Sequence, residues 1–267
     1  LGAFNDNLFK NALIVLLTFH TARWTNLSAG LLANLAAGIF ILPFFLFSAT
    51  AGQLADKYDK AMLARLVKVL EMLIMGVAAV GFFLTSLPVL MAALFLLGLH
   101  STLFGPVKYA ILPQHLRPEE MVGGNALIEA GTFVAILVGT LAGGLLAGSV
   151  EHPAWIALGG LLVAVAGYLC SRQVPAAPPP VPDLRISLNP ISETWNNIAH
   201  ARQNRTVFLS ILGISWFWLY GAMFLAQFPA YAKDVLGGGE NTVTLLLAIF
   251  TVGIGLGSLL CERMSGR

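Results

Sequence analysis

Runs of about 20 apolar residues recur along the chain and are separated by short polar segments. A helix of about 20 apolar residues is long enough to cross the hydrocarbon core of a bilayer. The polar–apolar alternation that typifies the strands of a membrane β-barrel does not occur. The pattern therefore predicts eight membrane-spanning helices. Their expected ranges are 1–20, 29–51, 62–86, 88–107, 124–148, 153–171, 207–232 and 241–261.

The composition points the same way, with 57% hydrophobic residues, 10% charged residues and a mean hydropathy of +0.81. A soluble domain carries about 25% charged residues, so the sequence predicts an all-α polytopic membrane protein. The net charge of +2 comes from scattered basic residues, which argues against a nucleic-acid partner.

A mostly polar, proline-containing segment, residues 172–206, separates the first six predicted spans from the last two. Such a segment cannot be buried in lipid and predicts an extended linker. Within it, Asn189 and Pro190 are typical of the N-cap and first position of a surface helix. The expected organisation is an N-terminal six-helix bundle (1–171), the linker (172–206) and the truncated start of a second bundle (207–267). We therefore expect the chain to be a piece of a longer protein.

The basic residues predict the orientation of the chain in the membrane. When the spans alternate in direction, nearly every Lys and Arg falls on the side of the linker. Only Arg23 and Lys233 fall on the other side, and Lys10 lies within the first span. Because cytoplasmic loops carry the excess of Lys and Arg, the linker and both ends of the chain are expected to be cytoplasmic.

The first span begins with a polar cluster formed by Asn5, Asp6, Asn7, Lys10 and Asn11. The apolar residues that follow, 12–19, give only about 12 Å of helix, far less than the roughly 30 Å of a bilayer core. The cluster is therefore expected at bilayer depth. Asp6 and Lys10 lie four residues apart on one helix face, where they would partly neutralise each other. Two interpretations stay open, a line of groups facing a central cavity or a network that packs helices together.

The fifth span contains a second polar face, because Asn125, Glu129 and Thr132 are spaced four and three residues apart. Two glycine pairs in the same span, Gly139 with Gly143 and Gly144 with Gly148, are each spaced four residues apart, which is typical of helices that approach closely. We expect these glycines to serve packing rather than chemistry.

Three further ionisable positions lie near or within the third and fourth spans. Pro106 is expected to break or bend its helix, which would place Lys108 near the cytoplasmic opening of the helical bundle. There Lys108 is either a ligand or a lysine that extends to the interface. Lys68 and Glu71 predict an ion pair at the cytoplasmic end of the third span. His100 is interpreted either as a hydrogen-bonded packing residue or as a proton relay.

Residues 52–60 lie between the second and third spans and are expected to form a tight exposed turn. The segment resembles the signature between helices two and three of major facilitator transporters. That signature usually has glycine where Asp59 stands. We expect Asp56 to cap the N-terminus of the next helix. The residues that carry the resemblance are Gly52, Asp56, Lys57 and Lys60. A weak repeat at 262–263, Glu-Arg, is similar to Asp-Lys at 56–57 and is consistent with a second half of such a fold.

Residues 2–7, 106–109 and 125–130 resemble more narrowly the lysophospholipid transporter family of bacterial inner membranes, above all the version fused to acyltransferase and acyl-ligase domains. The resemblance implies inward movement of lysophospholipid, chiefly lysophosphatidylethanolamine, for reacylation on the cytoplasmic face. It also implies a bilayer environment and a fused or associated acyltransferase.

A lysophospholipid presents a phosphate, an amine and one acyl chain. Lys108 or Lys10 could meet the phosphate and Asp6 or Glu129 the amine, while aromatic residues of the seventh span suit the acyl chain. The candidate substrate-binding residues are Asp6, Asn7, Lys10, Lys108, Asn125 and Glu129.

Two other function classes stay open. One is a different facilitator, such as an efflux antiporter for amphipathic compounds. The other is the membrane region of a multidomain acyltransferase. Acyltransferases of glycerolipids use a histidine with an aspartate five residues later, and no histidine of this chain has one. The sequence thus predicts no catalytic residue, metal site or cofactor within this segment.

Overall fold

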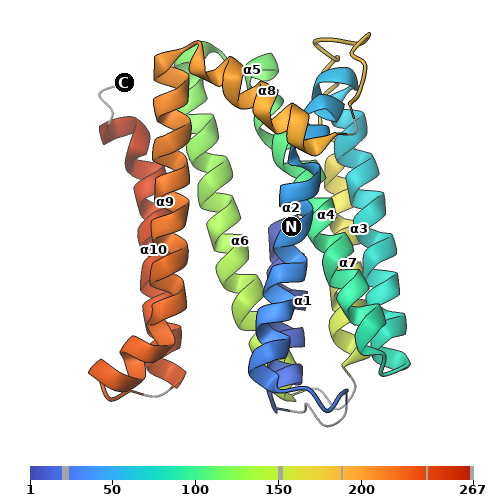
Figure 1. Ribbon diagram of the computed structural model, residues 1–267, viewed down its shortest axis with the longest axis vertical. Helices are drawn as coiled ribbons and strands as arrows, with labels where there is room; N and C mark the ends of the chain where they lie inside the picture. The colour runs from blue at the N-terminus through green and yellow to red at the C-terminus, as the bar shows by residue number, and fades with distance from the viewer. Residues whose placement is uncertain (20–23, 150–152, 188, 239, 265–267) are drawn as a thin grey trace.

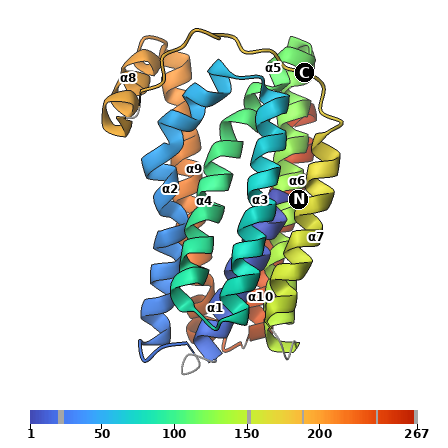
Figure 2. The same cartoon turned by 90° about the vertical axis from the view of Figure 1, so that its right-hand side faces the viewer.

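The computed structural model describes residues 1–19, 24–149, 153–187, 189–238 and 240–264. Within them the secondary structure is helical, without a strand. The long helices stand upright side by side, which Figures 1 and 2 show from two directions. The helices are α1 (Gly2–Phe19), α2 (Ala29–Lys57), α3 (Lys60–Phe83), α4 (Leu87–Ala110), α5 (Leu112–His115), a 3-10 turn (Pro118–Glu120), α6 (Met121–Ser149), α7 (Ala154–Ser171), α8 (Pro190–Arg202), α9 (Arg205–Ala230), a π turn (Tyr231–Val235) and α10 (Glu240–Met264).

Each of the eight predicted spans is a helix: α1 to α4, α6, α7, α9 and α10. Within the described residues, five stretches are long and apolar enough to cross a membrane. They are Asn34–Lys57, Lys60–Phe83, Leu87–His115, Pro118–Ala147 and Ala154–Ser171. The predicted fold class is confirmed, and the chain is a multi-pass membrane protein.

The helices pack in pairs that are distant in sequence. α1 packs against α6, α2 against α4, and α3 against both α4 and α7. A Cβ atom at Gly139 or Gly143 would overlap the carbonyl oxygens of Phe4 or Leu8 on α1. The predicted packing role is confirmed for these two glycines, because only a residue without a side chain lets the two backbones come so close. It is not confirmed for Gly144, where an added Cβ atom would meet nothing within 4 Å.

Two helices extend beyond their predicted ends. α2 continues through residues 52–57, so most of the expected tight turn is helical and only Tyr58 and Asp59 connect α2 to α3. α4 continues through Pro106 to Ala110 instead of breaking there. Pro106 lacks the N–H that would donate to the carbonyl oxygen of Thr102, a loss of one backbone hydrogen bond that membrane helices tolerate.

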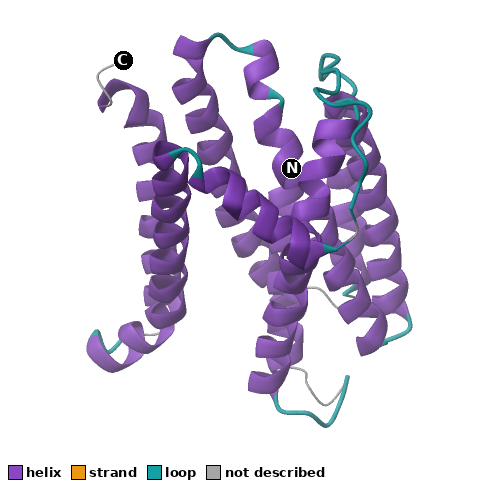
Figure 3. Ribbon diagram, turned by 45° about the horizontal axis from the view of Figure 1, so that its top comes forward, coloured by secondary structure: helices purple, strands orange, loops and turns teal. Residues whose placement is uncertain are grey.

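The linker leads into α8, whose start agrees with the prediction. Asn189 is the N-cap, and its side chain accepts hydrogen bonds from the backbone amides of Ile191 and Ser192. α8 packs against α2 and α9. In Figure 3 it crosses from the side of α2 to the start of α9. α9 and α10 stand at one side of the structure, where α10 packs against α6 (Figure 1).

Candidate functional site

The polar cluster of α1 lies deep in the helical bundle. Asn5 and Asp6 expose 0% and 6% of their surface. The start of α1 lies about midway between the two ends of the bundle in both views (Figures 1 and 2). This placement agrees with the length argument from the sequence, since too few apolar residues follow the cluster to put it at the membrane surface.

Glu71, at the middle of α3, is the centre of a buried charge network. One carboxylate oxygen, Oε1, accepts a hydrogen bond from Asn5 Nδ2 at 2.6 Å. The other, Oε2, lies 2.6 Å from Lys68 Nζ and 3.3 Å from His100 Nε2. Glu71 is fully buried and His100 exposes 1%. The predicted Lys68–Glu71 ion pair is confirmed, but its expected place at the cytoplasmic end was wrong.

Asp6 joins the same network through α4. Ser101 Oγ donates a hydrogen bond to Asp6 Oδ2, and Asp6 Oδ1 lies 4.0 Å from His100 Nδ1. Lys10, the partner expected from sequence spacing, instead places Nζ 5.1 Å from the centroid of the Phe40 ring. Among the described residues Asp6 and Lys10 form no direct ion pair, although their opposite charges still interact as the spacing predicted. The reason is that the neighbouring helix α4 offers Asp6 a hydroxyl and an imidazole at closer range.

Small residues make room for the network. Asn5 also donates to the carbonyl oxygen of Gly160 on α7 at 2.9 Å. A Cβ atom at Gly167 would lie 3.3 Å from Lys68 Cδ, and one at Gly2 would lie 2.9 Å from Lys68 Nζ. The network therefore ties α1, α3, α4 and α7 together. In the described part of the chain, no group of three or more His, Cys, Asp and Glu side chains is placed to hold a metal ion.

A second polar cluster connects α4 to α6. The hydroxyl of Tyr109 donates to Glu129 Oε1, and Lys108 Nζ lies 4.6 Å from the centroid of the Tyr109 ring. Lys108 and Glu129 are both half-buried. A cation, a hydroxyl and a carboxylate thus lie close together without being sealed from solvent.

An aromatic contact lies one helical turn from that cluster. Phe133, four residues after Glu129 on α6, stacks on Trp218 of α9 with ring centroids 5.7 Å apart and planes 15° apart. Residues four apart share a helix face, so the apolar contact and the carboxylate follow each other along α6. Of the seventh-span aromatics, Trp218 is the one that stacks on Phe133.

The remaining candidates bond mainly to their own helices. Asn7 Nδ2 donates to the carbonyl oxygen of Ala3, and Asn125 Nδ2 to that of Met121, each at 2.8 Å. Both asparagines are half-buried. The structure therefore does not bring all six candidates into one site: Asp6 belongs to the buried network, and Lys108 and Glu129 to the cluster between α4 and α6.

The motif at residues 52–60 holds the linker. The N-cap of α3 is Asp59 rather than the expected Asp56, because α2 extends past Asp56. Asp59 Oδ1 accepts from the amide of Met62 at 2.7 Å, and Oδ2 accepts from the amide of Ala177 at 2.8 Å. The amide of Lys60 in turn donates to the carbonyl oxygen of Ala177 at 3.0 Å.

The linker continues along the same motif. The amide of Val181 donates to the carbonyl oxygen of Asp56 at 3.0 Å, and the amide of Ser187 donates to Gln53 Oε1 at 2.7 Å. The aspartate that departs from the usual glycine of the signature thus has a structural role. Asp59 binds the linker at Ala177, whereas the sequence predicted only that the linker is extended.

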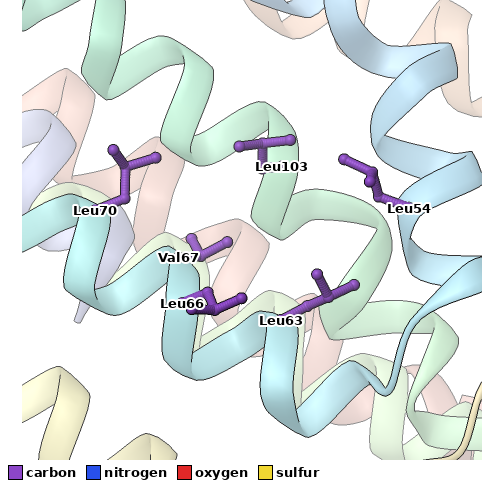
Figure 4. A pocket seen from close by; sticks show the side chains of 6 residues that line it. All are labelled: Leu54, Leu63, Leu66, Val67, Leu70 and Leu103. Atoms are coloured by element: carbon purple, nitrogen blue, oxygen red, sulfur yellow. The ribbon is translucent and has the colours of Figure 1, made fainter.

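A pocket of about 210 Å³ lies between α2, α3 and α4, and no member of either polar cluster lines it. Figure 4 shows that aliphatic side chains alone line it. They are Leu54, Leu63, Leu66, Val67, Leu70 and Leu103. Such a lining suits a hydrocarbon chain and offers no polar group to a headgroup.

Sequence reasoning did not assign a site role to Glu71 and gave His100 two open roles. The available signal was the cost of ionisable residues inside a span, which was applied to Asp6 but not to Glu71. Glu71 was instead assigned to a helix end, because the sequence of one helix does not show how deep in the bundle each of its residues lies.

Comparison with known proteins places the chain in a family. The model of the Major Facilitator Superfamily matches residues 1–267. Among curated proteins, the chain is 29% identical over 262 residues to the Lysophospholipid transporter LplT of Enterobacter sp. (strain 638), covering 97% of this chain and 62% of that protein.

Proteins of the same name from other bacteria are similar to the chain to the same degree. The identity is 28% over 267 residues for Serratia proteamaculans (strain 568) and 29% over 269 residues for Escherichia coli (strain SE11). In each case the match covers 97% of this chain and 62% of the relative. The chain thus spans less than two thirds of the length of these relatives.

Proposed function

The chain belongs to the major facilitator superfamily, and we propose that it forms part of a transporter that moves lysophospholipid across the bacterial inner membrane. The expected substrate is lysophosphatidylethanolamine, delivered to the cytoplasmic leaflet for reacylation by a fused or associated acyltransferase. The names of the similar curated proteins support this proposal.

The observation that carries the proposal is the cluster of Lys108, Tyr109 and Glu129 beside the Phe133–Trp218 stack. A lysophospholipid needs a cation for its phosphate, a carboxylate for its amine and an apolar surface for its single acyl chain. We assign Lys108 to the phosphate and Glu129 to the amine. Both are half-buried and therefore reachable, whereas Asp6 is sealed in the network. The aromatic stack, one turn further along α6, would meet the start of the acyl chain.

The other candidates have different proposed roles. Asn7, Lys10 and Asn125 are half-buried on α1 and α6, two helices that pack against each other, and we place them along the substrate path. Asp6 would act from within the network, by holding α1 to α4 through Ser101.

The proposed organisation keeps residues 1–171 as the N-terminal bundle, 172–206 as the linker and 207–267 as the start of a second bundle. The linker and both ends are proposed to be cytoplasmic. The basic residues support this orientation, because nearly all of them fall on the linker side of the alternating spans.

The test is uptake of headgroup-labelled lysophosphatidylethanolamine into spheroplasts that produce the full-length protein. Uptake is measured for wild type, Lys108→Gln and Glu129→Gln and normalised to folded protein. Loss of a hydrogen bond to a charged group costs about 1.5–3 kcal/mol, so each variant should transport about 10- to 100-fold less.

Glu119→Gln is the matched control, since Glu119 is an exposed carboxylate ahead of α6 and should leave uptake at the wild-type level. Wild-type uptake in both cluster variants would refute the site assignment. Absence of lysophospholipid uptake in the wild-type protein, together with proton-coupled export of amphipathic drugs, would replace the proposal by an efflux antiporter.

A further inference from the structure

We propose that α8 is an interfacial helix whose apolar side, formed by Ile191, Trp195 and Ile198, lies in the headgroup region of the leaflet on the linker side of the membrane. The partner that this side fits is a lipid surface containing anionic phospholipids. The inference goes beyond the proposed transport and does not depend on the identity of the substrate.

The apolar side of α8 is not the side that packs against the protein. Its three members are spaced four and three residues apart, so they share one side of the helix. In chain order they are 82%, 66% and 39% exposed. The half-buried residues of α8 lie on another side and are Pro190, Glu193 and Ala201. A surface helix of a globular protein turns its apolar side toward the core. Something other than the described part of the chain therefore covers the apolar side of α8.

The third side of α8 is polar and exposed, and it consists of Ser192, Asn196 and His200. The helix thus has protein on one side, an exposed polar surface on the second and an exposed apolar surface on the third. A helix that lies in the membrane plane has its apolar side toward the acyl chains and its polar side toward water. Trp195 suits such a position, because tryptophan is enriched at membrane–water interfaces.

Both ends of α8 are tied to the ends of predicted membrane spans. Only Gln203 and Asn204 separate α8 from α9, and a connection of this length reaches at most about 10 Å. At the other end, the amide of Ser187 donates to Gln53 Oε1 of α2 at 2.7 Å, three residues before α8 begins at Pro190. The headgroup region outside the hydrocarbon core is about 5–8 Å thick. These connections are therefore short enough to hold α8 at the membrane surface.

The orientation of α8 agrees with this placement. In Figure 1 it runs across the upright helices rather than along them, at the end of the structure where the linker lies. Figure 2 shows it at the outer edge of the structure, beside α2, rather than over the centre of the bundle. A helix at the edge of a bundle and across its long helices lies where the surrounding bilayer has its headgroups.

The charge of the segment favours a lipid surface over a second copy of α8. Residues 184–206 contain the basic side chains Arg185, Arg202 and Arg205 and one acid, Glu193. Arg202 follows the apolar side, four residues after its last member, and its guanidinium carbon lies 5.4 Å from the centroid of the Phe208 ring on α9. Anionic phospholipids attract basic segments at a membrane surface. A second α8 would carry the same positive charge.

The test is the surroundings of a fluorescent label on α8. In the full-length protein without native cysteines, Trp195→Cys and Asn196→Cys are labelled with one thiol-reactive fluorophore and placed in nanodiscs of phosphatidylcholine and phosphatidylglycerol. Lipids with a nitroxide near the top of the acyl chain quench the label from the membrane, and iodide quenches it from water. We expect the nitroxide lipids to quench the label at position 195 several-fold more than at position 196, and iodide to show the reverse preference.

Asn196 is the matched control, because it is the next residue, is also exposed and lies on the polar side. Ile191→Cys and Ser192→Cys form a second pair on the same two sides, so either pair decides if a member of the other does not fold. Equal iodide quenching on both sides would show that the apolar side faces water and would overturn the proposal. A label on the apolar side that is shielded from both quenchers would overturn it as well, because protein would then cover that side.

The charge argument has its own readout. When phosphatidylglycerol is replaced by phosphatidylcholine, the nitroxide quenching at position 195 should fall, because the arginines lose their anionic partners. Unchanged quenching would refute the requirement for anionic lipid. Since no lysophospholipid is present in these measurements, none of the results bears on the proposed transport.

Discussion

Replacement of Glu71 by alanine is the sharpest test of the buried network, because this one carboxylate contacts three elements. It accepts from Asn5 of α1, pairs with Lys68 of α3 and lies 3.3 Å from His100 of α4. Glu71→Ala would leave the Lys68 ammonium buried without its ion-pair partner and the Asn5 amide without one of its two acceptors.

The expected loss of stability follows from burial. Removing one partner of a buried ion pair costs about 3–5 kcal/mol, mostly because the remaining charge stays desolvated. For a chain of this size 1 kcal/mol corresponds to about 2–4 °C, so the thermal midpoint should fall on the order of 10 °C. Lys68 is only 6% exposed, so its ammonium has little access to water.

The chain contains a matched control for this substitution. Glu120 pairs with Arg117 at the same i, i+3 spacing and at 2.8 Å, but its side chain is 43% exposed. Glu120→Ala should lower the midpoint by only about 2–4 °C, because the exposed ion pair contributes little and the side chain accepts one further hydrogen bond, from the exposed Arg117 amide. Both variants are compared with wild type by thermal unfolding in detergent at pH 7.5, with tryptophan fluorescence as the signal. Equal midpoints for Glu71→Ala and Glu120→Ala would refute the argument that the network is sealed from water.

Two further predictions concern the linker and the orientation. Asp59→Asn keeps an acceptor for the Met62 amide but turns an amide donor toward the Ala177 amide, so limited digestion with trypsin should cleave at Arg185 several-fold faster than in wild type. Asp183→Asn, an exposed substitution in the same linker, should not alter the cleavage rate. Equal cleavage rates in all three proteins would show that Asp59 does not hold the linker. In a background without native cysteines, a cysteine at Asp183 should resist an impermeant thiol reagent in intact cells while one at Asn26 reacts, and the reverse labelling would invert the proposed topology.

The sequence determined the features that depend on one helix at a time. The lengths of the apolar runs predicted eight helices, and all eight are present. The short apolar stretch after Asn5 and Asp6 required these residues to lie at depth, and both are buried. Asn189 and Pro190 correctly predicted the start of α8. Gly139 and Gly143 were correctly interpreted as packing residues, but Gly144, which has the same spacing from Gly148, faces open space, so spacing along one helix did not by itself identify the packing face.

Only the tertiary structure decided which polar groups meet. Asp6 was expected to be partly neutralised by Lys10 one turn away, and the two charges do interact, but the hydrogen bond of Asp6 is made with Ser101 of α4. The Lys68–Glu71 pair was identified, but not its contacts with Asn5 and His100. A membrane helix is apolar on nearly every side, so its pattern does not reveal which face meets which neighbour or at what height. Those choices are fixed by the close packing of several helices at once, and that packing placed two acids, a lysine and a histidine from three separate helices in one network.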